Sequence, residues 1–320
     1  MTAGPTRSVF IGSGAFGRET LRRLAAAPEV ELVGVVSAPP RPAGRHARTS
    51  PTPINVLADS LAIPVVLTPE RLRAPEALAD VAALRPELVV LADYGQIVPA
   101  ALLGLPHGAL NLHPSLLPRH RGATPIAAAI LAGDTETGVS LMRMDAGLDT
   151  GPIVAQVRRP LNGTETAPEL EADLESMAAE LLAEHLGSWL RGALVARPQS
   201  GTGATLSRPL RRADGRLDAI RSARELERQV RAYQPWPGTF VDTVLGRLAV
   251  HAARPHRGDP ATAGVEPGTF VPDGLVVGDG AKPELLELLR VQPAGGRPMA
   301  WDAYVRGRPT IVGSRVLTGP

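Results

Sequence analysis

The sequence predicts an α/β protein whose first part is a doubly wound, mostly parallel sheet and whose second part is a small β-barrel. Over residues 1–191, short apolar runs alternate with helical patterns, which is typical of strand–helix–strand units. A segment rich in Gly, Ser, Thr and Pro follows over 192–206 and is expected to be an exposed linker. We therefore expect a Rossmann-like domain over 1–191, a linker over 192–206 and a β-barrel domain over 207–320.

The first part opens with a buried strand over 8–11, a Gly-rich turn, and a helix with Leu21, Leu24 and Ala25 on one side. The run at 87–92 is continuously apolar, as expected for a parallel strand that helices cover on both faces. Further strands are predicted over 31–36, 64–67, 108–112, 139–144 and 153–157. Further helices are predicted over 54–61, 69–84, 124–131 and 168–190.

The second part begins with a short amphipathic helix, predicted over 223–233. Short strands separated by Gly and Pro turns follow, over 239–244, 247–252, 274–277 and 285–291. A chain of 320 residues, 44% of them apolar, is long enough to bury a core in each of two domains.

The composition excludes several classes of protein. Without a cysteine, the chain forms neither disulfides nor thiolate metal sites. Its 7 histidines show no ligand spacing such as H-E-x-x-H, so no metal site is predicted. No run approaches the roughly 18 apolar residues that a membrane-spanning helix needs, and residues 1–7 do not begin a secretion signal. We expect a cytoplasmic protein that does not contact membranes.

Positive charge is concentrated in the second part. Residues 1–202 hold 17 Arg against 20 acidic residues, whereas residues 203–320 hold 16 Arg and Lys282 against 12 acidic residues. Eight of these arginines fall between Arg208 and Arg231. Such a density suits a phosphate-rich partner, although a solvated arginine-rich face is the commoner cause.

A glycine motif lies between the first strand and the first helix. Its G-x-G-x-x-G glycines are Gly12, Gly14 and Gly17. The dinucleotide-binding motif also needs an acidic residue after the second strand, and residues 37–40 (SAPP) supply none. Arg41 or Arg45 could instead receive the 2′-phosphate of NADP, so nicotinamide chemistry stays a minor alternative. Otherwise the glycines only let the strand turn tightly into its helix.

Polar residues without an obvious structural duty gather over 111–122, directly after a buried strand. This is where open α/β sheets place their sites. Asn111 and His113 share one face of the strand end. The Gly-rich loop over 144–151 can bring Asp149 toward them. These groups suit acyl transfer to an amine, because amide and imidazolium donors stabilise an oxyanion while the carboxylate favours the charged histidine. Alternatively, each is a strand-end cap or a loop-stabilising residue.

Two long runs resemble the signature of the folate-dependent formyltransferase family: NLHPSLLPRHRGATPI at 111–126 and GDTETGVSLMRMDAGLDTGPI at 133–153. The resemblance implies that Asn111, His113 and Asp149 are catalytic. It also implies that 10-formyltetrahydrofolate, a reduced folate, is consumed as co-substrate. Folate contacts are implied for two segments: Tyr94, Gly95, Gln96, Ile97 and Val98, and Ser115, Leu116, Leu117 and Pro118.

Three segments resemble the branch of this family that formylates methionyl initiator tRNA for translation initiation: 41–45 (RPAGR), 234–238 (QPWPG) and 288–299 (LLRVQPAGGRPM). The likeness implies an oligonucleotide-binding-like barrel and tRNA contacts by Arg41, Arg45, Arg208 and Arg211. Residues 46–48 depart from the usual glycine and lysine after Arg45. A sugar-nucleotide N-formyltransferase is the nearest alternative, and a non-catalytic RNA-binding protein is the second.

Overall fold

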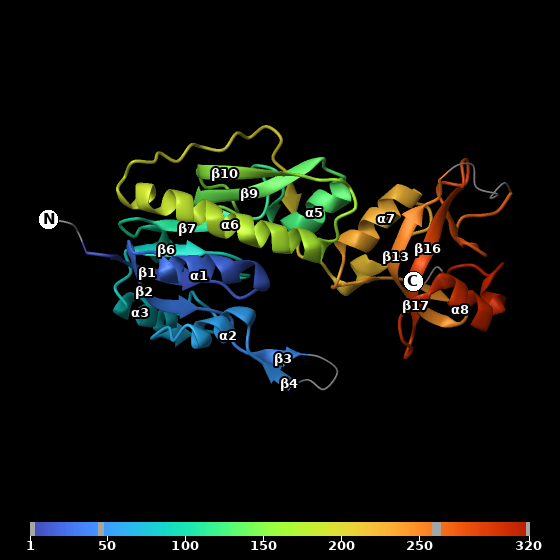
Figure 1. Ribbon diagram of the computed structural model, residues 1–320, viewed down its shortest axis with the longest axis horizontal. Coiled ribbons are helices and arrows are strands. Elements are labelled where there is room, and N and C mark those ends of the chain that lie inside the picture. The colour runs from blue at the N-terminus through green and yellow to red at the C-terminus, as the bar shows by residue number, and fades with distance from the viewer. Residues whose placement is uncertain (1–3, 44–47, 258–263, 318–320) are drawn as a thin grey trace. The chain divides into compact units, whose positions relative to one another are not determined.

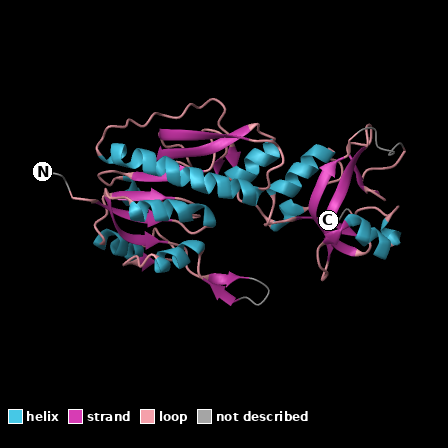
Figure 2. Ribbon diagram, in the orientation of Figure 1, coloured by secondary structure: helices cyan, strands magenta, loops and turns pink. Residues whose placement is uncertain are grey.

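The computed structural model describes residues 4–43, 48–257 and 264–317 (Figures 1 and 2). The chain forms two compact units. Unit 1 holds Met1–Pro125, Glu136–Pro160 and Leu170–Arg208, and unit 2 holds Ile126–Thr135, Leu161–Glu169 and Pro209–Pro320. Unit 2 also takes two segments from the first part of the sequence. The two units therefore do not test the domain boundaries predicted at 191 and 207, which remain a prediction.

A seven-stranded sheet forms the centre of unit 1. Its strands, in spatial order, are β10 (Ile153–Pro160), β9 (Glu136–Arg143), β7 (Ala109–His113), β6 (Leu88–Leu91), β1 (Thr6–Ile11), β2 (Val30–Val36) and β5 (Val66–Leu67). The five strands from β7 to β5 pair in parallel, whereas β9 and β10 pair antiparallel. The predicted doubly wound, mostly parallel fold is thereby confirmed.

Helices pack against this sheet because its central strands are apolar on both faces. Val9, Phe10 and Ile11 of β1 are fully buried, and α1 (Arg18–Ala26) turns Leu21 and Leu24 inward. The other helices of unit 1 are α2 (Pro53–Ser60), α3 (Pro75–Ala83), α4 (Ala100–Leu103) and, over most of its length, α6 (Ala167–Leu190). No helix in the described ranges is both long and apolar enough to span a bilayer.

The helix predicted over 69–84 begins only at Pro75. Residues 69–74 form a loop instead, and the amide of Leu72 donates a 2.9 Å hydrogen bond to Oε1 of Gln96. A contact distant in sequence therefore takes the place of helical bonding at Leu72, which periodicity alone cannot reveal.

Short elements complete unit 1 at the carboxyl ends of its strands. They are the 3₁₀ turn η1 (Ala15–Gly17), the hairpin of β3 (Arg41–Ala43) with β4 (Arg48–Ser50), and the pair of β8 (Arg121–Gly122) with β11 (Leu206–Ser207). Loops that follow β1, β6 and β7 meet at this edge, as parallel strands require.

Unit 2 contains an antiparallel sheet in the order β12 (Thr239–Thr243), β13 (Gly246–Pro255), β16 (Glu284–Pro293), β15 (Gly274–Val277) and β14 (Phe270–Val271), with β17 (Met299–Ala300) against β16. Helical elements of this unit are α5 (Pro125–Ala132), η2 (Arg212–Gly215), α7 (Ala223–Ala232), α8 (Trp301–Gly307) and η3 (Pro309–Ile311). This antiparallel sheet fits the predicted barrel-like domain.

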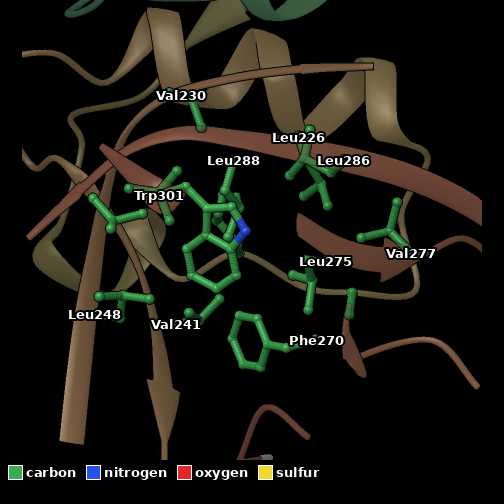
Figure 3. Close-up of a cluster of buried hydrophobic side chains, with 14 of the residues drawn as sticks. Leu226, Val230, Val241, Leu248, Phe270, Leu275, Val277, Leu286, Leu288 and Trp301 are labelled. Carbon is green, nitrogen blue, oxygen red and sulfur yellow. The ribbon is translucent and has the colours of Figure 1, made fainter. Parts of the chain in front are cut away.

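The core of unit 2 lies between α7 and the sheet (Figure 3). Ser222 and Glu225 cap α7 reciprocally through their backbone amides, and Leu226 and Val230 point into the core. Trp301, at the start of the unpredicted helix α8, stacks on Phe270 with 5.8 Å between ring centroids. Its indole nitrogen donates to the carbonyl of Pro272, so this large side chain is buried with its polar group satisfied.

Candidate active site

A cavity of about 530 Å³ opens at the carboxyl ends of β6 and β7, within the usual size range for small-molecule sites. Its walls come from three stretches: the loop at 93–98, the end of β7 at 111–114, and the loop at 144–149. Gly122 and Ala123 also line it. Segments far apart in sequence therefore enclose one space beside the sheet edge.

Asn111, His113 and Asp149 lie together in this cavity. Asn111 and His113 are both 5% exposed and occupy alternate positions of β7. Nδ2 of Asn111 donates a 3.5 Å hydrogen bond to Oδ1 of Asp149, and Nδ1 of His113 lies 3.8 Å from its Oδ2. The structure thus brings the three predicted residues together, while their catalytic role stays a prediction.

The backbone around Asp149 fixes its carboxylate. Asp149 adopts a left-handed conformation with φ of 51°, which Asp tolerates better than most residues. Its Oδ2 accepts a 2.7 Å hydrogen bond from the amide of Gly122. Gly151 closes the loop, where an added Cβ would lie 1.9 Å from the carbonyl oxygen of Arg143. Gly151 therefore serves close backbone packing.

The tautomer of His113 follows from its neighbours. Its Nε2 lies 2.9 Å from the carbonyl oxygen of His120. Because a carbonyl only accepts, Nε2 carries a proton, and the neutral ring keeps its lone pair on Nδ1, toward Asp149. Burial lowers the pKa of His113, and this outweighs the negative charge of Asp149 and the hydrogen bond to His120, which raise it. The ring is consequently neutral near pH 7 and ready to accept a proton.

The predicted folate loop, Tyr94 to Val98, lines the cavity throughout. The hydroxyl of Tyr94 is buried without a hydrogen-bond partner among the described residues, and burial raises the pKa of Tyr94 to about 12. Gln96 holds the loop through its contact with Leu72. Ile97 is 78% exposed, so an apolar side chain stands at the mouth of the cavity.

The second predicted folate segment, Ser115 to Pro118, does not line the cavity, although Pro114 directly before it does. Ser115 is fully buried and donates to the carbonyl of Arg119, and the amide of Leu117 donates to Oγ of Ser140. The apolar side chain of Leu117 is buried as well. Residues 115–118 therefore anchor the loop after β7, and a direct folate contact by them stays a prediction.

The three glycines of the G-x-G-x-x-G motif pack against residues 92–93. A Cβ on Gly12 or Gly17 would lie 2.5 or 3.0 Å from the carbonyl oxygen of Ala92, and one on Gly14 would lie 1.5 Å from Oδ2 of Asp93. The amide of Ser13 donates to the carbonyl of Asp93. The motif therefore joins the first turn to the loop that lines the cavity.

Carboxylates of α6 occupy the start of α1, where a dinucleotide would place its phosphates. Glu175 accepts hydrogen bonds from the amide of Glu19 and from the guanidinium of Arg18. Glu171 accepts one from the amide of Phe16, and burial and the charge of Asp93 raise its pKa. Anionic side chains at the helix N-terminus oppose a pyrophosphate there. The nicotinamide alternative thus lacks both its ribose carboxylate and its phosphate site.

Several site residues escaped the sequence analysis because they act through the backbone or from a distance. The amide of Gly122 and the carbonyl of His120 hold Asp149 and His113. Asp93 follows β6, lines the cavity and has φ of 56°, and desolvation raises its pKa although part of the residue is exposed. An acidic residue directly after a predicted buried strand could have identified Asp93 from the sequence. No pattern in the sequence pointed to Gln199, which contacts the backbone of Asp149.

The predicted tRNA-binding arginines are spread along the chain. Arg41 is exposed in β3, and Arg45 lies outside the described residues. Arg208 ends the first unit, where its carbonyl accepts from Oγ1 of Thr124, and the amide of Arg211 bonds Asp214. Across the part of the chain that the structure describes, no three His, Asp or Glu side chains are grouped to hold a metal ion.

Comparisons with known proteins match both parts of the chain. Residues 6–186 match the formyl transferase family model, and residues 209–309 match the model of the formyl transferase C-terminal domain. The chain is 43% identical to the methionyl-tRNA formyltransferase of Roseiflexus sp. (strain RS-1), over 98% of this chain and 95% of that one. It is 44% identical to the enzyme of the same name from Gluconacetobacter diazotrophicus, over 97% and 99% of the two chains.

Two solved structures share the fold at low sequence identity. The N-formyltransferase from Helicobacter canadensis, in complex with folinic acid and dTDP-3-aminofucose, has a TM-score of 0.62 at 14% identity, over 88% of this chain and 99% of that one. HypX from Aquifex aeolicus has a TM-score of 0.61 at 15% identity, over 95% of this chain and 49% of that one. This chain spans about half the length of HypX, and both likenesses concern the fold alone.

Proposed function

This chain belongs to the formyl transferase family, and on that premise we propose that it transfers the formyl group of 10-formyltetrahydrofolate to the α-amino group of methionyl-tRNA. The observation that carries the proposal is the meeting of Asn111, His113 and Asp149 in one cavity. Relatives that are more than 40% identical over nearly the whole chain, and that are named for this reaction, support the choice of acceptor.

His113 serves as the base in the proposed reaction. The amine nitrogen attacks the formyl carbon, and Nδ1 of His113 takes the proton that the nitrogen loses as the new C–N bond forms. The tetrahedral intermediate then collapses by breaking its bond to N10 of the folate, and the proton passes from the imidazolium to that nitrogen. Asp149, 3.8 Å from Nδ1, stabilises the imidazolium between the two transfers.

Asn111 serves as the oxyanion donor. Its amide nitrogen carries two hydrogens, of which the structure uses one in the long bond to Asp149. The other is available to the oxygen of the tetrahedral intermediate. A well-placed donor of this kind stabilises the transition state by roughly 3 kcal/mol, because the site is already organised before charge develops.

The cavity suits a flat, partly polar ring such as the pterin of folate. Leu91, Val98 and Met142 give it an apolar wall, and Asn111, His113 and Asp149 add polar groups to its lining. A ring with hydrogen-bonding edges would satisfy both conditions. We therefore assign the folate to the loop at 94–98, with its formyl-bearing nitrogen toward His113.

The tRNA contacts in this proposal rest on Arg41, Arg45, Arg208 and Arg211. Guanidinium groups bind phosphates through charge-assisted hydrogen bonds. We propose the initiator species as the acceptor, since its formylation starts translation, and the cytoplasm as the place of action, since charged tRNA is used there. The excess of arginine over acidic residues in 203–320 supports a polyanionic partner.

Formyl transfer by the purified chain tests the proposal. Methionyl initiator tRNA, methionyl elongator tRNA and an amino-sugar nucleotide are offered separately with 10-formyltetrahydrofolate, and the formylated products are quantified by mass spectrometry. We expect formylation of methionyl initiator tRNA and a much slower reaction of the elongator species. Formylation of the sugar nucleotide alone would favour the nearest alternative. Salt-dependent tRNA binding without folate binding would favour the RNA-binding alternative.

A further inference from the structure

The segment over 197–207, which we call the strap, is hydrogen-bonded to the loop that carries Asp149 and to the loop that follows β7. Its composition predicts an exposed linker, and most of it is exposed. Yet Arg197 pairs with Ile153 through two 2.8 Å backbone hydrogen bonds, and β11 at its other end pairs with β8. The strap is therefore fixed to unit 1 at both ends.

Gln199 forms four hydrogen bonds, two with the Asp149 loop and two with Arg121. Its Nε2 donates to the carbonyl oxygens of Asp149 and Gly151, at 2.8 and 2.7 Å. Its Oε1 accepts from Nε and Nη2 of Arg121, at 3.1 and 2.7 Å. One amide side chain thus clamps both sides of the turn in which Asp149 has a positive φ, and ties that turn to the loop after β7.

Thr205 connects the strap to the residues that hold His113. Its Oγ1 accepts a 2.8 Å hydrogen bond from the amide of His120 and lies 3.3 Å from Nδ1 of the same residue. His120 is the residue whose carbonyl oxygen faces Nε2 of His113. Moving Thr205 would therefore move the group that sets the tautomer of His113.

The far end of the strap holds Gly122. Oγ of Ser207 accepts from the amide of Thr124 and donates to the carbonyl of Arg121, both at 3.0 Å. A Cβ on Gly122 would lie 2.2 Å from the carbonyl oxygen of Ser207, so the two backbones touch. The amide of Gly122 is the 2.7 Å donor to Asp149. Both ends of the strap thus reach groups that hold the same carboxylate.

We propose that Gln199 and Thr205 are positioning residues for the formyl transfer, which act through Asp149 and His113 without touching the substrates. This inference rests on the proposed function. His113 and Asp149 must keep their relative positions through two proton transfers. Asp149 lies in a loop, and a loop keeps such a position when side chains outside the site fix it. The strap supplies those side chains. If it were only a spacer, its substitution would leave the chemical step unchanged.

Steady-state kinetics of Gln199→Ala separate these roles. We expect kcat to fall about 10- to 100-fold while KM for folate and for methionyl-tRNA changes less than about threefold, since the disturbed geometry concerns the transition state. Thr205→Val should behave likewise and Thr205→Ser should restore most of the rate. Thr202→Ala in the same strap is the control, because this residue is exposed and its hydroxyl forms no hydrogen bond with the described residues. Equal kcat in Gln199→Ala and the control would overturn the inference.

A double-mutant cycle and an NMR measurement complete the test. If Gln199 acts through Asp149, Gln199→Ala should cost little further rate in an Asp149→Asn background, whereas fully additive losses contradict the inference. Gln199→Glu replaces Gln199→Ala if the latter does not fold. Titration of the His113 ring by NMR gives a result that does not depend on activity. The pKa of His113 should fall in Gln199→Ala, because Asp149 moves away from the ring. His120 is the other titratable group near His113. An unchanged midpoint counts against it even if the wild type forms no product.

Discussion

Oδ2 of Asp149 lies 3.8 Å from Nδ1 of His113 and at the same time accepts the backbone amide of Gly122 at 2.7 Å. The peptide hydrogen bond holds the carboxylate in place, so its charge faces the nitrogen that must gain and lose a proton. Asn111 bonds the other oxygen. The carboxylate thus joins two candidate catalytic side chains that belong to one strand.

Replacing Asp149 by Asn should remove the charge and keep the shape. We expect kcat/KM for methionyl-tRNA to fall about 10²- to 10⁴-fold, since the imidazolium loses its partner. The apparent affinity for folate should change little. Formylation kinetics and folate fluorescence titration measure the two effects. A loss confined to folate binding would show that Asp149 binds the ligand and does not assist the chemistry.

The acid limb of the pH profile should report His113. Because burial lowers its pKa below the ordinary 6.5, the ring stays neutral as the pH falls through 6.5 and is lost as a base only below that value. Asp149 raises this pKa, so Asp149→Asn should move the limb to lower pH. The substrate amine titrates alike in both proteins and cancels in the comparison. A limb that moved to higher pH would contradict this arrangement.

Tyr94→Phe should separate stability from ligand binding. The buried hydroxyl has no partner among the described residues, so its removal should leave the free energy of unfolding unchanged or raise it by about 1 kcal/mol. Folate affinity should stay unchanged, because that hydroxyl has no accessible surface toward the cavity. Chemical denaturation and folate titration measure the two quantities. Marked destabilisation would mean that the hydroxyl is satisfied within the protein.

Gly14→Ala tests the packing role of the glycine motif. The new methyl group would overlap Asp93, so we expect a loss of about 1–3 kcal/mol in stability and weaker folate binding as the loop at 93–98 shifts. Gly104→Ala is the matched control, because its Cβ would meet only the carbonyl oxygen of Ala100 at 3.8 Å. Thermal denaturation of both variants gives the comparison. Binding of NADP by the wild type would revive the dinucleotide alternative.

Arg41→Ala combined with Arg45→Ala should weaken tRNA binding without altering folate binding. We expect KM for methionyl-tRNA to rise several-fold, and the slope of log affinity against log salt to shrink by about one for each phosphate that the variant no longer binds. Filter binding at several salt concentrations measures the slope. Arg7→Ala is the control, since Arg7 pairs with Glu31 in the described structure. An identical slope in the double variant and wild type would remove these arginines from the interface.

The alternation of apolar runs with helical patterns was enough to predict the parallel sheet, because both faces of its strands must be covered. The same logic placed Asn111 and His113 at the end of a strand and Asp149 in a glycine-rich loop. The start of α3 and the helix at Trp301 were missed, since contacts distant in sequence decide them. Residues 115–118 were identified by a family motif, but a motif does not say whether a side chain faces the cavity. In the structure these residues do not line it.

The sequence by itself determined the fold class through its periodicity, and its resemblance to the folate-dependent formyltransferases pointed to the family and to the three candidate catalytic side chains. Only the tertiary structure decided which nitrogen of His113 is free and what holds Asp149. Both depend on carbonyl and amide groups, which every residue carries and no sequence pattern distinguishes. For the same reason a stretch with the composition of a linker proved to be attached to the loops of the candidate active site.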